Sequence, residues 1–128
     1  FRALATAESV EALQNAFYLD GQWQQAREKW AAWFARYAAL VAEQNPTAVQ
    51  QTARVSRMNA ANPKYVLRNY LAQQAIDAAH AGDYSKIAEL LDVMRKPYDD
   101  QPGREIYAEK RPDWARTKAG CSMLSCSS

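Results

Sequence analysis

A stripe of aromatic side chains between residues 22 and 44 constrains the fold of this 128-residue chain more than any other feature. Apolar side chains recur there at intervals of three, four and seven residues, at Trp23, Ala26, Trp30, Trp33, Phe34, Tyr37, Leu40 and Val41. This spacing puts them on one face of an α-helix, whereas a half-buried strand would alternate apolar and polar residues. Asn45 and Pro46 follow, and the residue before a proline is pushed out of the helical region. The sequence therefore predicts a helix over 22–44 with a ring-bearing buried face.

Four further helices are predicted around this one. Their expected ranges are 7–18, 47–58, 63–81 and, after a cap at Asp83 or Ser85, the stretch up to Pro97. We interpret Asp20 and Gly21 as the turn that closes the first helix. Asn62 and Pro63 are typical of an N-cap and a first helical position, and Gly82 of a C-terminal stop. The side chains expected to face inward in the last two helices are Val66, Leu67, Tyr70, Leu71, Ala75, Ala78, Ile87, Leu90, Leu91 and Met94.

The composition favours a helical fold with a thin core. Alanine accounts for 25 residues, whereas Leu, Ile, Val and Phe together account for 21. Disordered chains combine scarce aliphatic residues with high net charge and few rings, but here the net charge is +2 and there are 4 Trp and 7 Tyr. We therefore predict an all-α fold of about five helices in an irregular bundle over residues 1–96. A loop-rich C-terminal tail follows over residues 97–128.

Several functional classes are excluded at this stage. The nearly balanced charge gives no reason to expect nucleic acid, and no apolar stretch is long enough to span a membrane. The chain has no glycine-rich phosphate loop. Its only histidine, His80, is expected at a helix end, where it complements the helix dipole. We predict no catalytic, cofactor-binding or metal-binding residue in this chain.

Three polar motifs have both a structural and a functional interpretation. Residues 62–65 match the N-P-x-Y motif read by phosphotyrosine-binding modules, although a helix start also explains Asn and Pro. Asp99 and Asp100 are a carboxylate pair that is typical of a solvated turn. Arg68 and Asn69 either face solvent or, for Arg68, clamp a carboxylate from another segment.

The two cysteines, Cys121 and Cys126, both lie close to the C-terminus. A disulfide framework would distribute cysteines through the fold, so they are not expected to staple a secreted domain. Their spacing allows a small loop, and an exposed terminal thiol is accessible to oxidants. The alternative is two inert thiols at the end of the chain. We predict Cys126 and Cys121 as the candidate redox residues.

The second half of the chain contains a string of motifs in a definite order. They are Arg57-Met58, Asn62-Pro63-Lys64-Tyr65-Val66-Leu67-Arg68-Asn69-Tyr70-Leu71-Ala72-Gln73-Gln74-Ala75-Ile76, Gly82-Asp83-Tyr84-Ser85, Pro97-Tyr98-Asp99, Pro112-Asp113-Trp114-Ala115 and Ser125-Cys126-Ser127-Ser128. In this order and at these spacings they resemble the C-terminal region of the selenoprotein O family. The resemblance is strong over residues 57–128 and looser over the Trp-rich helix before them.

The resemblance implies a kinase-like protein (pseudokinase) that transfers AMP from ATP to Ser, Thr or Tyr hydroxyls of proteins, with Mg or Mn. It implies that this chain is the C-terminal part of a larger kinase-like protein whose nucleotide and metal sites lie in a preceding core. The chain alone is then expected to be inactive. Its expected partners are that N-terminal core and the protein substrates of the whole enzyme, and its expected location is the bacterial cytoplasm.

Within the resemblance, Cys126 matches a terminal position that is selenocysteine in many eukaryotic members and cysteine in bacterial ones. This match implies a redox-active thiol that pairs with a cysteine of the core. Cys121 is outside the signature, and it is either a competing partner or incidental. The family role predicted for this chain is structural support plus a redox-sensitive tail. The alternative hypothesis is a free-standing α-helical protein-interaction module that binds a partner through its Trp and Tyr face.

Overall fold

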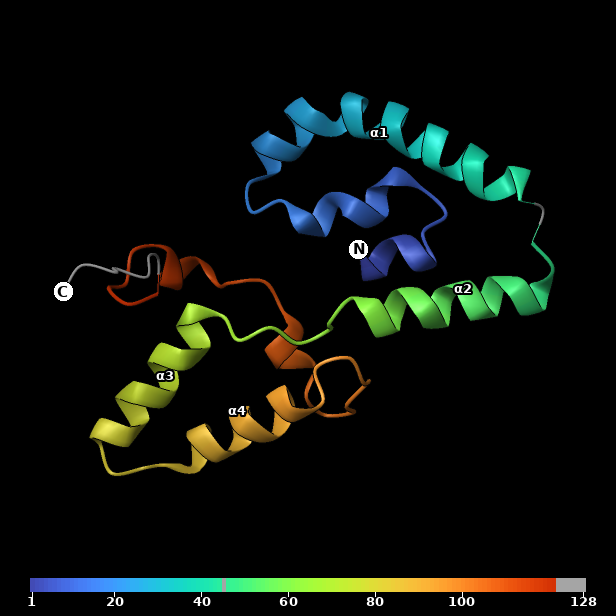
Figure 1. The fold of residues 1–128 in the computed structure, drawn as a ribbon. Helices are drawn as coiled ribbons and strands as arrows, with labels where there is room; N and C mark the ends of the chain where they lie inside the picture. The colour runs from blue at the N-terminus through green and yellow to red at the C-terminus, as the bar shows by residue number, and fades with distance from the viewer. Residues whose placement is uncertain (45, 122–128) are drawn as a thin grey trace. The chain divides into compact units, whose positions relative to one another are not determined.

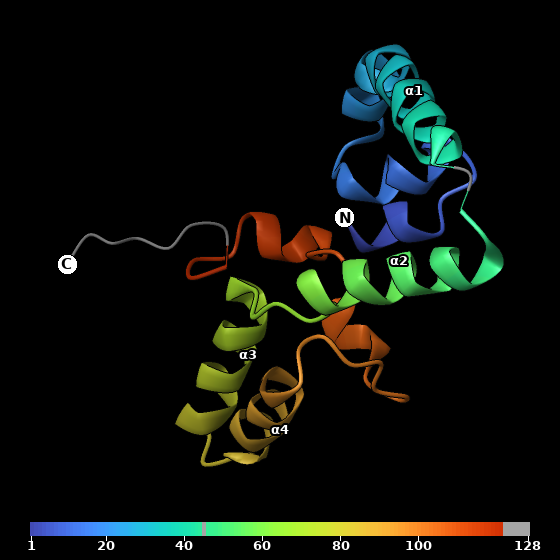
Figure 2. The same cartoon turned by 45° about the vertical axis from the view of Figure 1, so that its right-hand side comes forward.

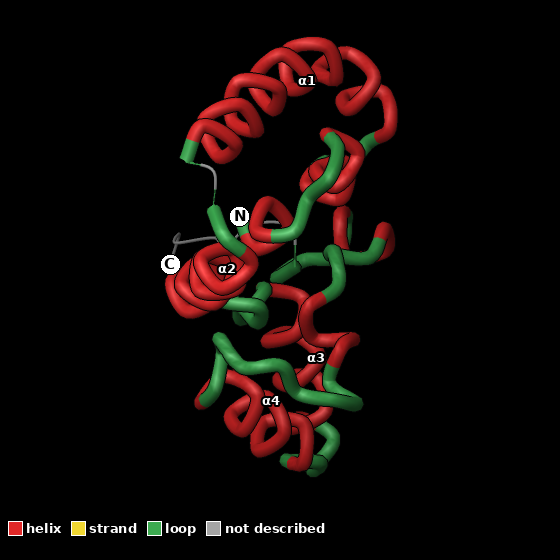
Figure 3. The backbone as a smooth tube through the Cα atoms, turned by 90° about the vertical axis from the view of Figure 1, so that its right-hand side faces the viewer, coloured by secondary structure: helices red, strands yellow, loops and turns green. Residues whose placement is uncertain are grey.

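The computed structural model describes residues 1–44 and 46–121. Within these ranges it contains four α-helices and four 3-10 helices, and Figure 3 shows only helix and loop there. In chain order the elements are η1 (Arg2–Ala5), η2 (Val10–Ala16), α1 (Asp20–Glu43), α2 (Ala48–Ala61), α3 (Asn69–His80), α4 (Ser85–Arg95), η3 (Glu105–Ala108) and η4 (Asp113–Arg116). The all-α prediction is confirmed.

The chain divides into two compact units, Phe1–Asn62 and Pro63–Ser128, and each unit is described by itself. The compositional boundary predicted at residue 97 lies inside the second unit and stays a prediction. In the described part of the chain, none of the helices combines the length and the apolar character that crossing a membrane requires.

The core of the first unit forms where α1 meets the two 3-10 helices. Trp23 and Phe34 of α1 are buried together with Leu4 of η1 and Val10 of η2. Figure 1 shows η2 running beside α1, and Phe17 just after η2 packs 5.3 Å from the Trp23 ring. The rings thus supply the apolar surface that this aliphatic-poor sequence lacks elsewhere.

The predicted ring-bearing face of α1 is confirmed in part, since Trp23 and Phe34 are buried. Trp33 stacks on Tyr37 with ring centroids 5.5 Å apart and planes inclined by 7°. Trp30 and Leu40, which the stripe placed inward, are exposed. A helix of this length is only partly covered by the short elements that pack on it, so some side chains of the stripe stay in contact with water.

Helix α2 is held by a capping box and by one arginine. The Thr47 side chain accepts from the Gln50 amide while the Gln50 side chain accepts from the Thr47 amide, which satisfies two N-terminal donors. Arg54 of α2 donates to the Tyr37 hydroxyl at 2.9 Å and to the Ala5 carbonyl at 2.8 Å. This guanidinium therefore joins α2 to both α1 and η1.

The second unit is built on the antiparallel pair of α3 and α4, which Figure 2 shows side by side. Gly82 follows α3 with φ 87°, the left-handed conformation that glycine adopts without a Cβ penalty. The predicted stop at Gly82 is therefore confirmed. Asp83 does not form the formal N-cap of α4, but its carboxylate accepts from the Ser85 amide at 2.9 Å.

The helix start predicted at Asn62 and Pro63 is wrong. Asn62 ends α2 and donates its side-chain amide to the Met58 carbonyl at 2.8 Å, and α3 begins only at Asn69. The intervening residues are held in a non-helical conformation because the Lys64 and Tyr65 amides both donate to the Pro97 carbonyl, at 2.8 and 3.1 Å. A contact so distant in sequence leaves no local signal.

Two predictions about the first turns are also wrong. Asp20 and Gly21 do not close a helix but begin α1, since the amides of Gln22 and Trp23 both donate to the Leu19 carbonyl. A carboxylate is favourable at that end of a helix dipole. The helix expected over 7–18 is the shorter 3-10 helix η2, and η1 had no sequence signal.

Candidate functional site

Cys121, one of the two predicted redox residues, lies in the core of the second unit. Its side chain is 2% exposed, and its thiol is free. Its amide donates to the Lys118 carbonyl at 3.1 Å, and Gly120 before it has φ 80°, so a tight turn directs the side chain inward. Cys126 lies outside the described residues.

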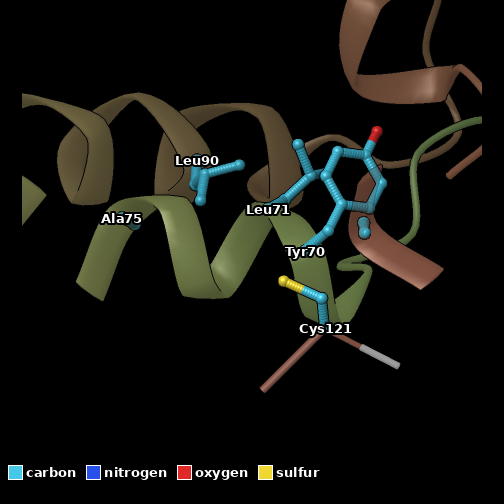
Figure 4. Close-up of a cluster of buried hydrophobic side chains, with 6 residues drawn as sticks. Tyr70, Leu71, Ala75, Leu90 and Cys121 are labelled. Carbon is cyan, nitrogen blue, oxygen red and sulfur yellow. The ribbon is translucent and has the colours of Figure 1, made fainter. Parts of the chain in front are cut away.

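Apolar side chains from both helices and from the C-terminal segment surround this thiol. The cluster consists of Tyr70, Leu71, Ala75, Leu90, Ala115 and Cys121, with Tyr107 packed against it. Figure 4 shows the Cys121 sulfur directed toward α3. Buried thiols in apolar surroundings are inert compared with exposed thiolates. The geometry gives Cys121 a packing role, and its redox role stays a prediction.

An ion pair and one ring contact attach the segment that carries Cys121 to α3. Lys118 Nζ donates to Asp77 Oδ2 and lies 5.8 Å from the centroid of the Trp114 ring. Trp114 in turn meets Tyr70 edge to face at 6.1 Å. The hydrogen bond from Lys118, followed by one from Gln73, lowers the pKa of Asp77, and the same bond raises the pKa of Lys118. The pair holds the turn around Cys121 in place.

A cavity of about 330 Å³ in the second unit shares two of these rings. Its lining includes Tyr70, Gln74, Lys86, Tyr107, Lys110 and Trp114. Burial, followed by a hydrogen bond with Glu89, raises the pKa of Tyr107, so its hydroxyl is protonated in neutral solution. Among the described residues that line it there is no cysteine, histidine or carboxylate pair. The cavity therefore offers lysine and tyrosine donors, aromatic rings and the single carboxylate of Glu109.

An apolar groove of about 310 Å³ lies on the α3–α4 pair. Buried Ala75 and Leu90 contribute to it, and the aliphatic side chains of Ile76, Ile87 and Leu91 line it while remaining about half exposed. Ile87 and Leu91 were expected to face inward. They line the open groove instead and stay about half exposed. Val93, which the predicted stripe omitted, is the α4 residue with no exposed surface.

The remaining sequence candidates are structural. Tyr65 of the N-P-x-Y match is 1% exposed, and its hydroxyl lies 3.3 Å from both the amide and the carbonyl of Gln101, so the motif is not presented to a phosphotyrosine-binding module. Asp100 accepts from Lys64 Nζ at 2.7 Å. His80 is the exposed last residue of α3, as its predicted dipole role requires.

Arg68 and Asn69 take different places from the predicted helix interior. Arg68 is the N-cap residue of α3 and Asn69 its first residue, and both side chains are half-buried. In the ranges 1–44 and 46–121, no three His, Cys, Asp or Glu side chains gather in a way that could hold a metal ion.

Tyr65 is the organising residue that sequence reasoning missed. Its hydroxyl bonds to the backbone of Gln101 in the loop after α4. The side-chain amide of Gln101 in turn donates to the Val93 and Lys96 carbonyls, at 3.0 and 2.9 Å. These bonds satisfy acceptors at the C-terminal end of α4. The signal was present in the sequence as an aromatic residue directly after Asn-Pro-Lys, but a helix start explained it equally well.

Comparison with known proteins gives one family. The family model described as "Protein adenylyltransferase SelO" matches residues 1–95. A protein nucleotidyltransferase YdiU of Azoarcus sp. (strain BH72) is 53% identical over 132 residues, covering 100% of this chain and 25% of the relative. One of the same name from Xanthomonas campestris pv. campestris (strain B100) is 56% identical over 116 residues, covering 91% of this chain and 22% of the relative. The chain thus spans about a quarter of the length of the curated relatives it matches.

Proposed function

The chain belongs to the family of the protein adenylyltransferase SelO, a family of protein nucleotidyltransferases, and from this membership we propose that it works as part of a longer AMP-transferring enzyme. In that reaction a Ser, Thr or Tyr hydroxyl of a protein attacks the α-phosphorus of ATP, AMP is attached to the oxygen, and pyrophosphate leaves. The observation that carries the proposal is the 53% identity to a relative of which this chain covers 25%.

We propose that this quarter of the enzyme supports the catalytic body rather than supplying catalytic groups. The ATP and the Mg or Mn ion would be held by the kinase-like remainder. This division is supported by the chemistry of the described residues, which place a buried free thiol and mixed cation–ring cavity in the second unit rather than a set of carboxylates. Bound Mg normally needs carboxylate oxygens and nucleotide phosphates.

The test is a hybrid enzyme. The Azoarcus relative is truncated by the quarter that matches this chain, and a second version carries this chain in that place. With labelled ATP, Mg or Mn and an acceptor protein, we expect AMP transfer from the hybrid and from the intact relative. The truncated relative and this chain alone should transfer none. A soluble hybrid no more active than the truncated relative would favour the interaction-module hypothesis, and activity of the isolated chain would refute the supporting role.

We also propose that Cys126 is a redox-sensitive position of the whole enzyme, on the resemblance of the terminal Ser125-Cys126-Ser127-Ser128 to the family signature. Disulfide formation there would remove two protons and two electrons from two thiols and pass them to an added oxidant such as oxidised glutathione. In the hybrid, Cys126→Ala should abolish the dependence of activity on reductant. Because Cys121 is buried, Cys121→Ala should leave that dependence intact. Unchanged reductant dependence in Cys126→Ala would contradict the role.

A further inference from the structure

The α3–α4 groove has a one-sided, apolar chemistry. Aliphatic, alanine and methionine side chains line it, and no described residue with a charged or amide side chain contributes to its walls. Leu67, Ile76, Ile87 and Leu91 surround the opening and are each about half exposed. Single exposed aliphatics are ordinary on protein surfaces, but a contiguous group around a hollow marks an interaction site.

The shape of the groove limits what can occupy it. Its volume is about 310 Å³, roughly twice the 150 Å³ cavity that takes up a benzene-sized molecule. Two large aliphatic or aromatic side chains would therefore fill it. A polar or charged group entering it would lose its hydrogen bonds to water without finding a partner. A polypeptide that occupies the groove must therefore present an apolar ridge.

The size of the groove also decides how such a ridge is held. Eight residues line it, whereas a stable interface between separate proteins uses about 20–30 residues on each side. A second copy of the chain or a diffusing partner would gain too little from this surface alone. A segment of the same polypeptide avoids most of the entropic cost of association and meets the groove at a high effective concentration.

The matched relatives carry about three times the length of this chain outside the region that it covers. We propose that the α3–α4 groove receives an apolar segment from that remaining three-quarters of the enzyme and fixes this quarter to the catalytic body. The inference rests on the proposed function, because it takes the longer polypeptide as the working form. It goes further in naming the surface and the chemistry of its occupant.

The test measures thiol labelling in the hybrid of the Azoarcus relative, in a Cys126→Ser, Cys121→Ala background. Leu91→Cys places a thiol at the groove, and Asp92→Cys is the matched control on the same helix, at a side chain that is 66% exposed. Each maleimide labelling rate is divided by its rate in concentrated urea. We expect labelling at position 91 to be at least about 100-fold slower than at 92, because a covered thiol reacts only after local opening. Rates within a few-fold of each other would overturn the proposal.

Photo-crosslinking identifies the occupant. When leucine is replaced throughout by its diazirine analogue, the peptide that contains Leu91 should crosslink to residues outside this quarter of the hybrid. Crosslinks to residues 1–62, or protection that disappears on hundredfold dilution, would overturn the proposal in favour of the first unit or a second copy. If the hybrid is insoluble, the same cysteines are placed at the matching positions of the Azoarcus protein. If the hybrid is active but the thiol at position 91 is labelled fast, the groove proposal is rejected and the proposed function stands. If the hybrid is inactive but labelling at position 91 is slow, the proposed function is rejected and the groove proposal stands.

Discussion

Removing a single hydroxyl at Tyr65 should weaken the whole second unit. The ring is 1% exposed, and its hydroxyl donates to the Gln101 carbonyl and accepts from the Gln101 amide, both at 3.3 Å. Tyr65→Phe keeps the packing of the ring but leaves both Gln101 groups without this partner. A neutral hydrogen bond contributes about 0.5–1.5 kcal/mol net. Because both bonds are long, we expect a total loss of about 1–2 kcal/mol.

The matched control is Tyr84→Phe, which deletes the same hydroxyl from a side chain that is 65% exposed. Thermal unfolding followed by far-ultraviolet circular dichroism is a suitable measurement. A loss of about 1 kcal/mol lowers Tm by about 4–8 °C in a domain of this size. Tyr65→Phe should therefore lower the Tm of the second unit by about 4–16 °C, and Tyr84→Phe should change it by less than about 2 °C. Equal melting of the two variants would refute the reasoning that Tyr65 fastens the loop after α4.

Three further variants test the turns and the ion pairs. Gly82→Ala should destabilise the chain by about 1 kcal/mol in urea unfolding, because its φ of 87° disfavours a Cβ even though nothing lies within 4 Å. Gly21→Ala in helical α1 should leave the free energy of unfolding unchanged or raise it. A loss of stability in both glycine variants, or in neither, would contradict this. Arg54→Ala should cost the first unit about 2 kcal/mol by the same assay, since its guanidinium bonds two other elements; a loss below about 0.5 kcal/mol would disprove the role. The pKa of Asp77 is lowered by Lys118 on folding, so its stabilisation is present above the unfolded pKa of about 3.9 and lost as pH falls through the folded pKa. Asp77→Asn should then flatten the decline of Tm below about pH 4, and parallel Tm curves would argue against it.

Local sequence patterns predicted the helices well where packing follows periodicity. The stripe from Trp23 to Tyr37 identified α1 because rings at helical spacing have to share one face, and the helix predicted from residue 47 corresponds to α2, whose N-cap is Thr47. Gly82 marked the turn after α3 because only a left-handed residue fits there. In each case the determining interaction lies within a few residues of the signal.

The error at the start of α3 arose because a distant segment decides the conformation there. Asn62 and Pro63 satisfy every local rule for a helix start, but the Pro97 carbonyl captures the amides of Lys64 and Tyr65 and delays α3 until Asn69. No pattern around residue 63 encodes the position of residue 97.

At the candidate site, too, the sequence predicted what local patterns decide and missed what contacts between distant segments decide. The sequence places Cys121 close to the C-terminus, but its burial follows from the ion pair between Lys118 and Asp77 and from Trp114 against Tyr70. Both contacts join the segment around Cys121 to α3, which is distant from it in the sequence. Apolar residues on α3 and α4 were correctly expected to matter, whereas the division between the buried side chains and those that flank the groove depends on how the two helices are rotated against each other.

The shared Pro97 carbonyl also makes the helix pair a cassette whose two ends meet. Lys64 and Tyr65 enter within hydrogen-bond distance of the residue at which the chain leaves α4, and the glycine turn closes the far end. A segment with adjacent ends can be transplanted into a surface loop of another protein without stretching that loop, or can accept new termini at its turn. Residues 64–97 carry the whole lining of the apolar groove, whereas Gln101, Ala115 and Cys121, which complete the core of this unit, lie outside that segment and would have to move with it.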